Sequence, residues 1–308
     1  MLSRVAERMY WFGRYVERIE NTARLISVNT NLVLDLPHVK YIWGSLLSIT
    51  GYEKQFFERF SVEDERNIIK FLLDDDSCSI MMSVRMAREN ARTTREIMPN
   101  EAWEKINRLY LYLQKNIQKG VKRDGRHQLL KDITAQCQEL NGYLAGCMSA
   151  DEAWAFMKIG SDLERADMTT RILDVGCLNL PNTEHPEIRE QETILWMNVL
   201  QSLTAYQMYR QHVDDTVNGE DVAAFLLLDE KFPRSVAHCL YDVNEAFRSL
   251  PNHELPLKNV TQTQRNISNA DIPKLLGGPG LHKFIDDLQS DMASVHGDIA
   301  ATWFGYDN

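Results

Sequence analysis

The sequence predicts an all-α fold, a bundle of about a dozen helices built from two similar halves. Three observations lead to this prediction. Apolar residues recur at the helical period nearly everywhere, and strand-like alternation is hard to find. A charged helical motif occurs twice. Shorter matches accompany the motif in the same order in both halves, which indicates an internal repeat.

The first predicted helix, residues 2–26, has two distinct faces. One face is apolar and consists of Val5, Met9, Phe12, Val16, Ile19, Ala23 and Ile26. The other is polar and consists of Ser3, Glu7, Arg14, Glu17, Arg18, Asn21 and Arg24. Its cations are all arginine, and Tyr10, Trp11 and Tyr15 flank it. Because a planar guanidinium suits buried bidentate pairing, we expect protein or a ligand to cover this face.

The motif returns in the second half, where Gly13–Leu25 aligns without a gap to Gly160–Ile172. The recurring pairs are Gly13/Gly160, Glu17/Glu164, Arg18/Arg165, Glu20/Asp167, Thr22/Thr169 and Arg24/Arg171. In each copy the second acid precedes the last arginine by one helical turn. This order favours an intrahelical ion pair.

The rest of the first half predicts further helices with recognisable ends. Pro37 and Pro99 act as breaks, and Ser61 resembles an N-cap with acids in the first turn. The helices expected here are 41–52, 61–73, 79–98, 101–118 and 126–147, with a loop at 74–77.

The second half opens with Ser149-Ala-Asp-Glu, a capping sequence for the helix that carries the second motif. Phe232-Pro-Arg-Ser is expected to begin a helix, since proline is tolerated in a first turn. The helices expected are 149–175, 190–212, 221–228, 232–250 and one from Gly280 to Gly305, with loops at 176–187 and 250–256. The aromatic tail Thr302–Tyr306 either closes the bundle or inserts into a partner.

The repeat extends beyond the motif helices. Trp43–Leu47 matches Trp196–Leu200, and Thr50-Gly-Tyr52 matches Thr204-Ala-Tyr206. Phe71–Asp74 and Ser79-Ile80 match Leu226–Asp229 and Ser235-Val236. We therefore expect two helical halves, 1–147 and 148–308, packed as one domain. Our hypothesis is that they pack around a pseudo-two-fold axis with the charged faces near it.

Composition excludes several classes of protein. The chain has 308 residues, is 44% hydrophobic and 25% charged, and carries a net charge of -10, which disfavours nucleic acid and anionic membranes as partners. No apolar run approaches the roughly 20 residues that span a bilayer. Arg4, Glu7 and Arg8 interrupt any signal-peptide core. The five scattered cysteines are odd in number, which predicts reduced thiols in the cytoplasm.

Two interpretations of the Glu-Arg faces stay open. In the first, the Glu-Arg pairs are buried and fix the register of packed helices. In the second, they line a cleft in which the arginines hold a carboxylate or phosphate, while the acids orient the arginines or engage an amine. The candidate residues are Glu7, Arg14, Glu17, Arg18, Asn21, Arg24, Arg88, Asn90, Glu164, Arg165, Asp167, Arg171 and Arg234. Arg88 and Asn90 represent a further Arg-rich face, and Arg234 lies near a predicted helix start.

Other site chemistries are poorly supported. No His-x-x-x-His, His-Glu-x-x-His or Glu-x-x-His pattern occurs, so we expect no metal. There is no Gly-x-Ser-x-Gly elbow and no P-loop, and no cofactor is expected. Cys78, Cys147 and Cys239 are expected to be structural thiols, and His212 and His238 to be core or surface residues.

The opening residues Leu2–Arg24, together with Asp162–Asp167 and Phe232–Ser235, resemble the bacterial alpha-E family, named for its helices and its Glu-Arg motif. Ala87–Arg92 and Glu101–Glu104 share the resemblance, which covers essentially the whole chain.

The resemblance implies a context and not a reaction. Alpha-E proteins are encoded beside, or fused to, a circularly permuted ATP-grasp protein of the amide-ligase type. Transglutaminase-like and proteasome-like Anbu peptidases occur in the same neighbourhoods. The expected function is a partner or co-catalytic component of a system that makes or attaches a short peptide, with a peptide or amino acid as ligand. The alternatives are a stand-alone enzyme acting on a peptide or amino acid, and a structural scaffold.

Overall fold

The computed structural model describes residues 1–36, 42–178, 186–276 and 280–305. Within these ranges all regular structure is helical, with fifteen α-helices and one short π-helix, so the predicted all-α class is confirmed. The chain divides into two compact units, Met1–Glu164 and Arg165–Asn308. The helix α8 (Glu152–Leu178) begins in the first unit and ends in the second.

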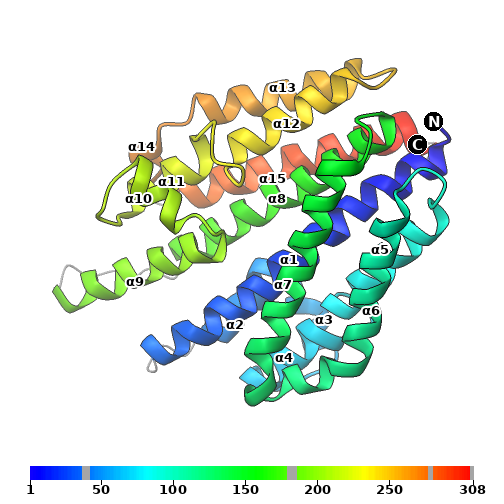
Figure 1. Cartoon of the computed structure of the whole chain (residues 1–308). Helices are drawn as coiled ribbons and strands as arrows, with labels where there is room; N and C mark the ends of the chain where they lie inside the picture. The colour runs from blue at the N-terminus through cyan, green and yellow to red at the C-terminus, as the bar shows by residue number, and fades with distance from the viewer. Residues whose placement is uncertain (37–41, 179–185, 277–279, 306–308) are drawn as a thin grey trace. The chain divides into compact units, whose positions relative to one another are not determined.

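The first unit is organised around α1 (Ser3–Asp35), the longest helix of the chain. The helices α5 (Ile80–Thr93) and α7 (Arg123–Cys147) pack along it, and α6 (Asn100–Val121) packs on both of them (Figure 1). Because it has neighbours on more than one side, α1 buries residues of both faces, from Met9 and Ile19 to Glu17 and Asn21. Protein therefore covers the polar face of α1, as expected.

Three short helices complete the first unit: α2 (Ile42–Thr50), α3 (Glu53–Phe57) and α4 (Glu65–Asp74). Gly51 ends α2 in the left-handed conformation with φ 72°, and the amide of Tyr52 donates to the carbonyl of Leu47. These features form a Schellman turn, in which glycine carries no penalty for its positive φ. Beyond it, Phe56, Phe60 and Phe71 form an aromatic cluster.

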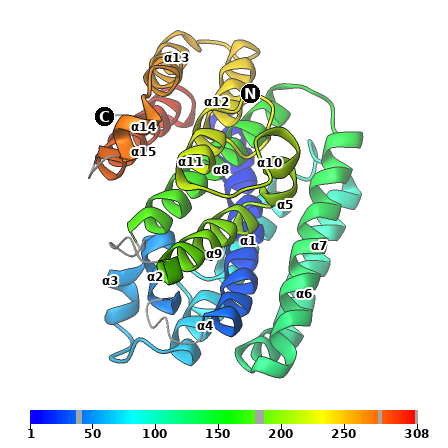
Figure 2. The ribbon, with the colours of Figure 1, turned by 90° about the vertical axis from the view of Figure 1, so that its left-hand side faces the viewer.

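The second unit contains the end of α8 followed by seven helices and the short π-helix. The helices are α9 (Pro186–Ser202), α10 (Tyr206–His212), α11 (Gly219–Leu228), α12 (Val236–Arg248), α13 (Glu254–Ser268), α14 (Ile272–Leu276) and α15 (Gly280–Ile299). The helices α12, α13 and α15 pack in that order, and α11 packs against α12 and α9 (Figure 2). The π-helix Ala300–Phe304 extends α15.

Polar side chains begin several of these helices. Asp64 caps α4 by accepting from the amide of Asn67, and Ser79 caps α5 by accepting from that of Met82. Asp151 accepts from two amides at the start of α8, and Ser235, in the second unit, accepts from the amide of His238. Each cap satisfies an amide that the first turn leaves without a helical partner.

The structure corrects two predicted helix starts. Ser61 does not cap α4, because Asp64 does. Phe232, Pro233 and Arg234 do not form the first turn of α12; they precede it, and Ser235 is the N-cap.

Other predicted segments were also wrong. Residues 190–212 are two helices, because Thr204 takes a left-handed φ of 53° and ends α9. Residues 254–256 belong to α13, where Pro256 lies in the first turn and needs no amide hydrogen bond. The helix from Ser79 ends at Thr93 and not Met98. Residues 176–178 and 186–187 are helical, while 179–185 lie outside the described residues.

The aromatic tail docks on its own unit. Trp303 and Phe304 are buried, and the indole Nε1 of Trp303 donates to the carbonyl oxygen of Pro251 at 2.8 Å. The same ring stacks on Phe247 with 5.7 Å between ring centroids. Of the two expectations, closure of the bundle is the one that these residues fulfil; Tyr306 lies outside the described residues.

The cysteines Cys78, Cys137 and Cys239 are buried, Cys177 is half-buried and Cys147 is exposed. Burial raises the pKa of the Cys137 thiol well above its usual value and that of Cys78 to about 11. Both thiols therefore stay protonated near neutral pH. None of the described helices combines the length and the apolar character that crossing a membrane requires. Among the described residues, no cluster of three or more His, Cys, Asp or Glu is arranged to hold a metal ion.

Candidate functional site

The two motif helices cross at their glycines. A Cβ atom added to Gly13 would lie 2.1 Å from the carbonyl oxygen of Met157, and one added to Gly160 would lie 2.0 Å from that of Tyr10. The contact is reciprocal, because Tyr10 and Met157 each precede the glycine of their own helix by three residues. Glycine is therefore required at both positions for the backbones of α1 and α8 to approach each other.

One turn further along α8, the carboxylate of Glu164 receives two arginines of α1. Arg14 Nε donates to Oε2 at 2.7 Å, while Arg18 Nε donates to Oε1 at 2.5 Å and Arg18 Nη2 to Oε2 at 3.0 Å. Glu164 is 3% exposed. Each arginine is thus fixed by the second copy of the motif, and Glu164 is the acid that joins α8 to α1.

Aromatic rings flank both guanidinium groups. The Arg14 guanidinium lies 5.5 Å from the ring of Trp11 and donates from Nη1 to the Tyr10 hydroxyl at 3.0 Å. The Arg18 guanidinium lies 5.7 Å from the ring of Tyr15, which stacks on Trp11. The aromatic residues that the sequence places beside the arginines therefore hold those arginines by cation–π contact.

The charges of this cluster are strongly coupled. Burial alone would raise the pKa of Glu164, but Arg18 and Arg14, by charge and by hydrogen bonds, lower it to about 2. Burial would lower the pKa of Arg18, and Glu164 raises it above its usual value. Burial raises the pKa of Tyr10. Near neutral pH the cluster therefore holds one carboxylate and two guanidinium ions.

Further along α1, a second buried polar group faces α7. Arg24 Nη2 donates to Glu20 Oε1 at 2.5 Å, and Gln138 of α7 donates to the same oxygen at 3.3 Å. Glu17 is fully buried and accepts from the hydroxyl of Ser161 at 3.4 Å, and Asn21, four residues further along α1, is also buried. The predicted Glu20–Arg24 intrahelical pair is confirmed.

The remaining candidates of the first unit lie elsewhere. Arg88 faces α6, where it donates to Asn107 at 2.8 Å and packs over Trp103 and Tyr110. Asn90 is half-buried on the same helix, and Glu7 is half-buried on α1. The structure thus brings Arg14, Arg18 and Glu164 together and pairs Arg88 with another helix.

The second copy of the motif continues into the second unit. Arg171 Nε donates to Asp167 at 2.9 Å, which confirms the other predicted intrahelical pair. Thr169 donates to the carbonyl of Arg234 at 2.9 Å, and Arg165 Nη1 lies 3.5 Å from the carbonyl of Pro233. Arg234 is half-buried. Thr169 and Arg165 of the motif therefore contact the turn that precedes α12.

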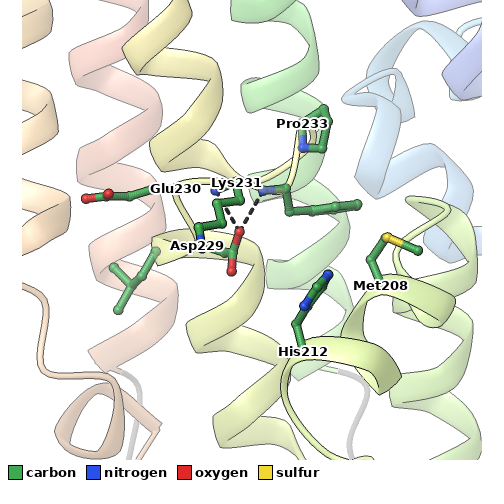
Figure 3. Close-up of a pocket in the computed structure, with 8 residues that line it drawn as sticks. Met208, His212, Asp229, Glu230, Lys231 and Pro233 are labelled. Carbon is green, nitrogen blue, oxygen red and sulfur yellow. Dashed lines mark hydrogen bonds between the residues drawn. The ribbon is translucent and has the colours of Figure 1, made fainter.

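Against this turn the second unit has a pocket of about 470 Å³, drawn in Figure 3. Its lining residues are Met208, His212, Leu228, Asp229, Glu230, Lys231, Phe232 and Pro233. Met208 and His212 come from α10, and the others from the end of α11 and the turn. The volume is typical of small-ligand pockets.

Sequence analysis missed this pocket and one buried ion pair. His212, expected in the core or on the surface, is exposed, and it also lines the pocket. Arg126 is 2% exposed and donates to Glu65 at 2.8 Å, linking α7 to α4. His212 and Arg126 do not belong to a repeated motif. The repeat that revealed the Glu-Arg face therefore did not point to either residue.

Comparisons with known proteins identify the family of the chain. Residues 1–304 match Alpha-E, described as a predicted alpha-helical domain with a conserved ER motif. The chain belongs to this family, and the resemblance drawn from its motifs is confirmed.

Curated relatives of the chain include uncharacterized proteins of Mycobacterium bovis and Mycobacterium tuberculosis. Each is 26% identical over 278 residues, which cover 80% of this chain and 30% of the relative. The chain thus spans less than a third of the length of these relatives. No solved structure matches the chain.

Proposed function

We propose that this protein is a helical partner, non-catalytic or co-catalytic, of a circularly permuted ATP-grasp ligase that makes or attaches a short peptide by amide-bond formation. In this proposal the ligase supplies ATP chemistry, and the helical protein binds the ligase or its peptide product. A transglutaminase-like peptidase would trim the product. We place the system in the cytoplasm, where cysteine thiols stay reduced and ATP is present.

One observation carries the proposal. In the mycobacterial relatives the matching region is only 30% of the polypeptide, so there it is one part of a larger protein. A module that occurs joined to other regions is suited to work beside another component. The chain belongs to the Alpha-E family. The motif resemblance to that family implies the kind of component, an ATP-grasp protein.

Within this proposal, the Glu-Arg motif of the first unit is primarily architecture. Glu164 is buried and held by two arginines of α1, an arrangement that fixes how the two helices cross. The cleft interpretation applies to the arginine groups that keep partial exposure. Arg14 and Arg18 are 14% and 21% exposed, so an incoming carboxylate of a peptide could reach their outer edges.

We also infer that the chain is an internal duplication with pseudo-two-fold character. The helix orders agree, with long motif helices α1 and α8 each followed by the series α2–α4 and α9–α11. Both series contain a turn in which a left-handed residue, Gly51 or Thr204, ends a helix. The prediction of halves at 1–147 and 148–308 stands as part of this inference.

The experiment is co-purification of this chain with the ATP-grasp protein encoded beside it. ATP consumption and product mass are measured with and without the chain. We expect a stable complex and a product whose amount depends on the chain. Arg171→Ala tests the partly exposed motif pair in a protein that should remain folded, with circular dichroism as the control for folding.

A scaffold is the second candidate function, and the burial of Glu164 favours it. If no complex forms and the product is independent of the chain, the ligase proposal fails. If the chain alone converts peptides or amino acids, the stand-alone enzyme replaces it.

A further inference from the structure

The pocket of the second unit has a filled counterpart in the first. In the first unit Asp75 follows α4, and its Oδ1 accepts from the amide of Ser77 at 2.8 Å. Its Oδ2 is paired with Arg59, which follows α3. The carboxylate thus caps the turn with one oxygen and binds a guanidinium with the other.

Asp229 occupies the same place in the second unit. It follows α11, and its Oδ1 accepts from the amides of Lys231 at 2.8 Å and Phe232 at 2.6 Å. Its carbonyl accepts from the cap Ser235, as the carbonyl of Asp75 accepts from the cap Ser79. Among the described residues, no cation is paired with Asp229.

The residue in place of Arg59 is His212. The register follows from matching backbone hydrogen bonds, Phe60 N to Phe56 O in the first unit and Val213 N to Tyr209 O in the second. Counting back one residue from Phe60 and from Val213 gives Arg59 and His212. The shorter imidazole lines the pocket and leaves the second oxygen of Asp229 without the guanidinium that Asp75 has.

The apolar side chains next to these two positions also differ in size between the units. Phe60 stacks on Phe56 with 5.1 Å between centroids, whereas its counterpart Val213 is small and 42% exposed. Phe232 stacks on Phe225 from the turn instead. Replacing arginine and phenylalanine by smaller residues explains why an open pocket exists on this unit. Figure 3 shows Met208 and His212 facing Asp229 across it.

We propose that this pocket binds the side chain of an arginine or lysine in a peptide segment, with Asp229 as the anion that receives the guanidinium or ammonium. The ligand would take the place that Arg59 takes beside Asp75. Met208, Leu228 and Phe232 offer apolar surface to the methylene stem. A guanidinium is the better match, because its fork can donate to a carboxylate whose other oxygen is already engaged.

The surrounding charge agrees with a cationic ligand. Of the two acids in the lining, Asp229 faces Met208 and His212, while the carboxylate of Glu230 points away from them in Figure 3. Asp214, which follows α10, and Glu220, in the first turn of α11, are further exposed acids of this unit. The whole chain carries a net charge of -10. Such a field raises the local concentration of cations.

The site is preformed because its turn is held from several sides. The ring of His238 contacts the carbonyl of Glu230 at 2.8 Å, and the thiol of Cys239 contacts that of Pro233 at 3.5 Å. Thr169 donates to the carbonyl of Arg234 from α8. A rigid pocket loses little conformational entropy on binding. The inference goes beyond the proposed ligase partnership and does not depend on it.

The test is a titration of the full chain, labelled with ¹³C at its methionine methyl groups, with Nα-acetyl-arginine methylamide. Met208 lines the pocket, and its signal is assigned with Met208→Leu. We expect a saturable shift of this signal with the arginine probe. The citrulline analogue has nearly the same shape and no charge, and it should bind about tenfold more weakly or not at all.

Two variants locate the site. Asp229→Asn keeps an oxygen that can cap the turn and removes the charge, so affinity should fall roughly tenfold or more. His212→Arg restores the residue found beside Asp75 and should abolish binding by occupying the pocket itself. Glu220→Gln removes an exposed charge outside the lining and should change affinity by less than about threefold.

The proposal is overturned by equal binding of arginine and citrulline, or by arginine binding that survives His212→Arg. A missing shift up to about 10 mM, well above a 1 mM dissociation constant, also overturns it. Should Asp229→Asn fail to fold, His212→Arg decides alone, because it leaves every turn contact of Asp229 in place.

Discussion

The two copies of the Glu-Arg motif place the same ion pair in different surroundings. In α1, Glu20 and Arg24 have side chains 4% and 13% exposed, and Gln138 of α7 adds a hydrogen bond. In α8, Asp167 and Arg171 are 24% and 32% exposed. Helix geometry creates both pairs, but only tertiary packing removes water from the first. The comparison shows that one motif can be buried architecture in one place and a partly solvated pair in another.

The largest effect is expected at Glu164, the buried acid of the second motif copy, which receives two arginines of the first copy. Glu164→Gln removes the charge that Arg14 and Arg18 share, so unfolding in urea should show a loss of about 3 kcal/mol. Glu152→Gln is the matched control, since the Glu152 side chain is 39% exposed and, among the described residues, paired only with the amino terminus of Met1. It should change stability by less than about 0.5 kcal/mol. Equal effects of the two would remove the contrast between buried and exposed pairs.

Lowering the pH should reduce the stability that the buried carboxylate of Glu164 contributes. The pKa of Glu164 is about 2 in the folded protein and 4.5 ordinarily. A lowered carboxyl pKa stabilises the fold above the unfolded value, and this contribution is lost as pH falls through the folded value. The stability difference between wild type and Glu164→Gln, followed by denaturation at pH values from about 5 to 2, should therefore shrink by up to about 3 kcal/mol. A difference independent of pH would contradict the assigned pKa.

The helix crossing gives the next effect. Gly13→Ala forces a methyl group against the carbonyl of Met157 and should cost about 1–3 kcal/mol in thermal unfolding. Gly142→Ala, in α7, meets nothing within 4 Å and should gain up to about 1 kcal/mol from helix propensity. A stable Gly13→Ala protein would mean that α1 and α8 can separate at little cost.

The two intrahelical pairs can be compared directly. Arg24→Ala leaves Glu20 buried without its guanidinium and should cost about 2 kcal/mol. Arg171→Ala breaks a partly solvated pair and should cost about 0.5 kcal/mol. Chemical denaturation of both variants measures the difference. Equal costs would show that the surroundings do not matter to these pairs.

The smallest effect lies in the turns that end α2 and α9. Thr204 has φ 53° where the first unit has Gly51 at φ 72°. A β-branched residue is strained there, so Thr204→Gly should stabilise by up to about 1 kcal/mol. Gly51→Ala should destabilise by a similar amount. The melting temperatures of the two variants should move in opposite directions.

Much of the architecture could be predicted from sequence, because the spacing of apolar residues indicates which face of each helix is buried. The apolar stripe of α1, the caps Ser79 and Ser235 and both intrahelical pairs are local features, and the structure contains them. Thr204 marks where this reasoning stops. A threonine gives no sign of a left-handed turn. The sequence repeat aligned Thr204 with Thr50, whereas the backbone conformation aligns it with Gly51, one residue later.

The sequence by itself determined the helical class, the family and the repeated charges, since all three depend on residue types at fixed spacings along one chain. Tertiary structure alone decided that Glu164 receives Arg14 and Arg18, that Arg88 faces α6, and that His212 leaves a pocket beside Asp229. These contacts join residues far apart in sequence. Their energies depend on how much water the surrounding helices exclude, which a linear pattern does not record.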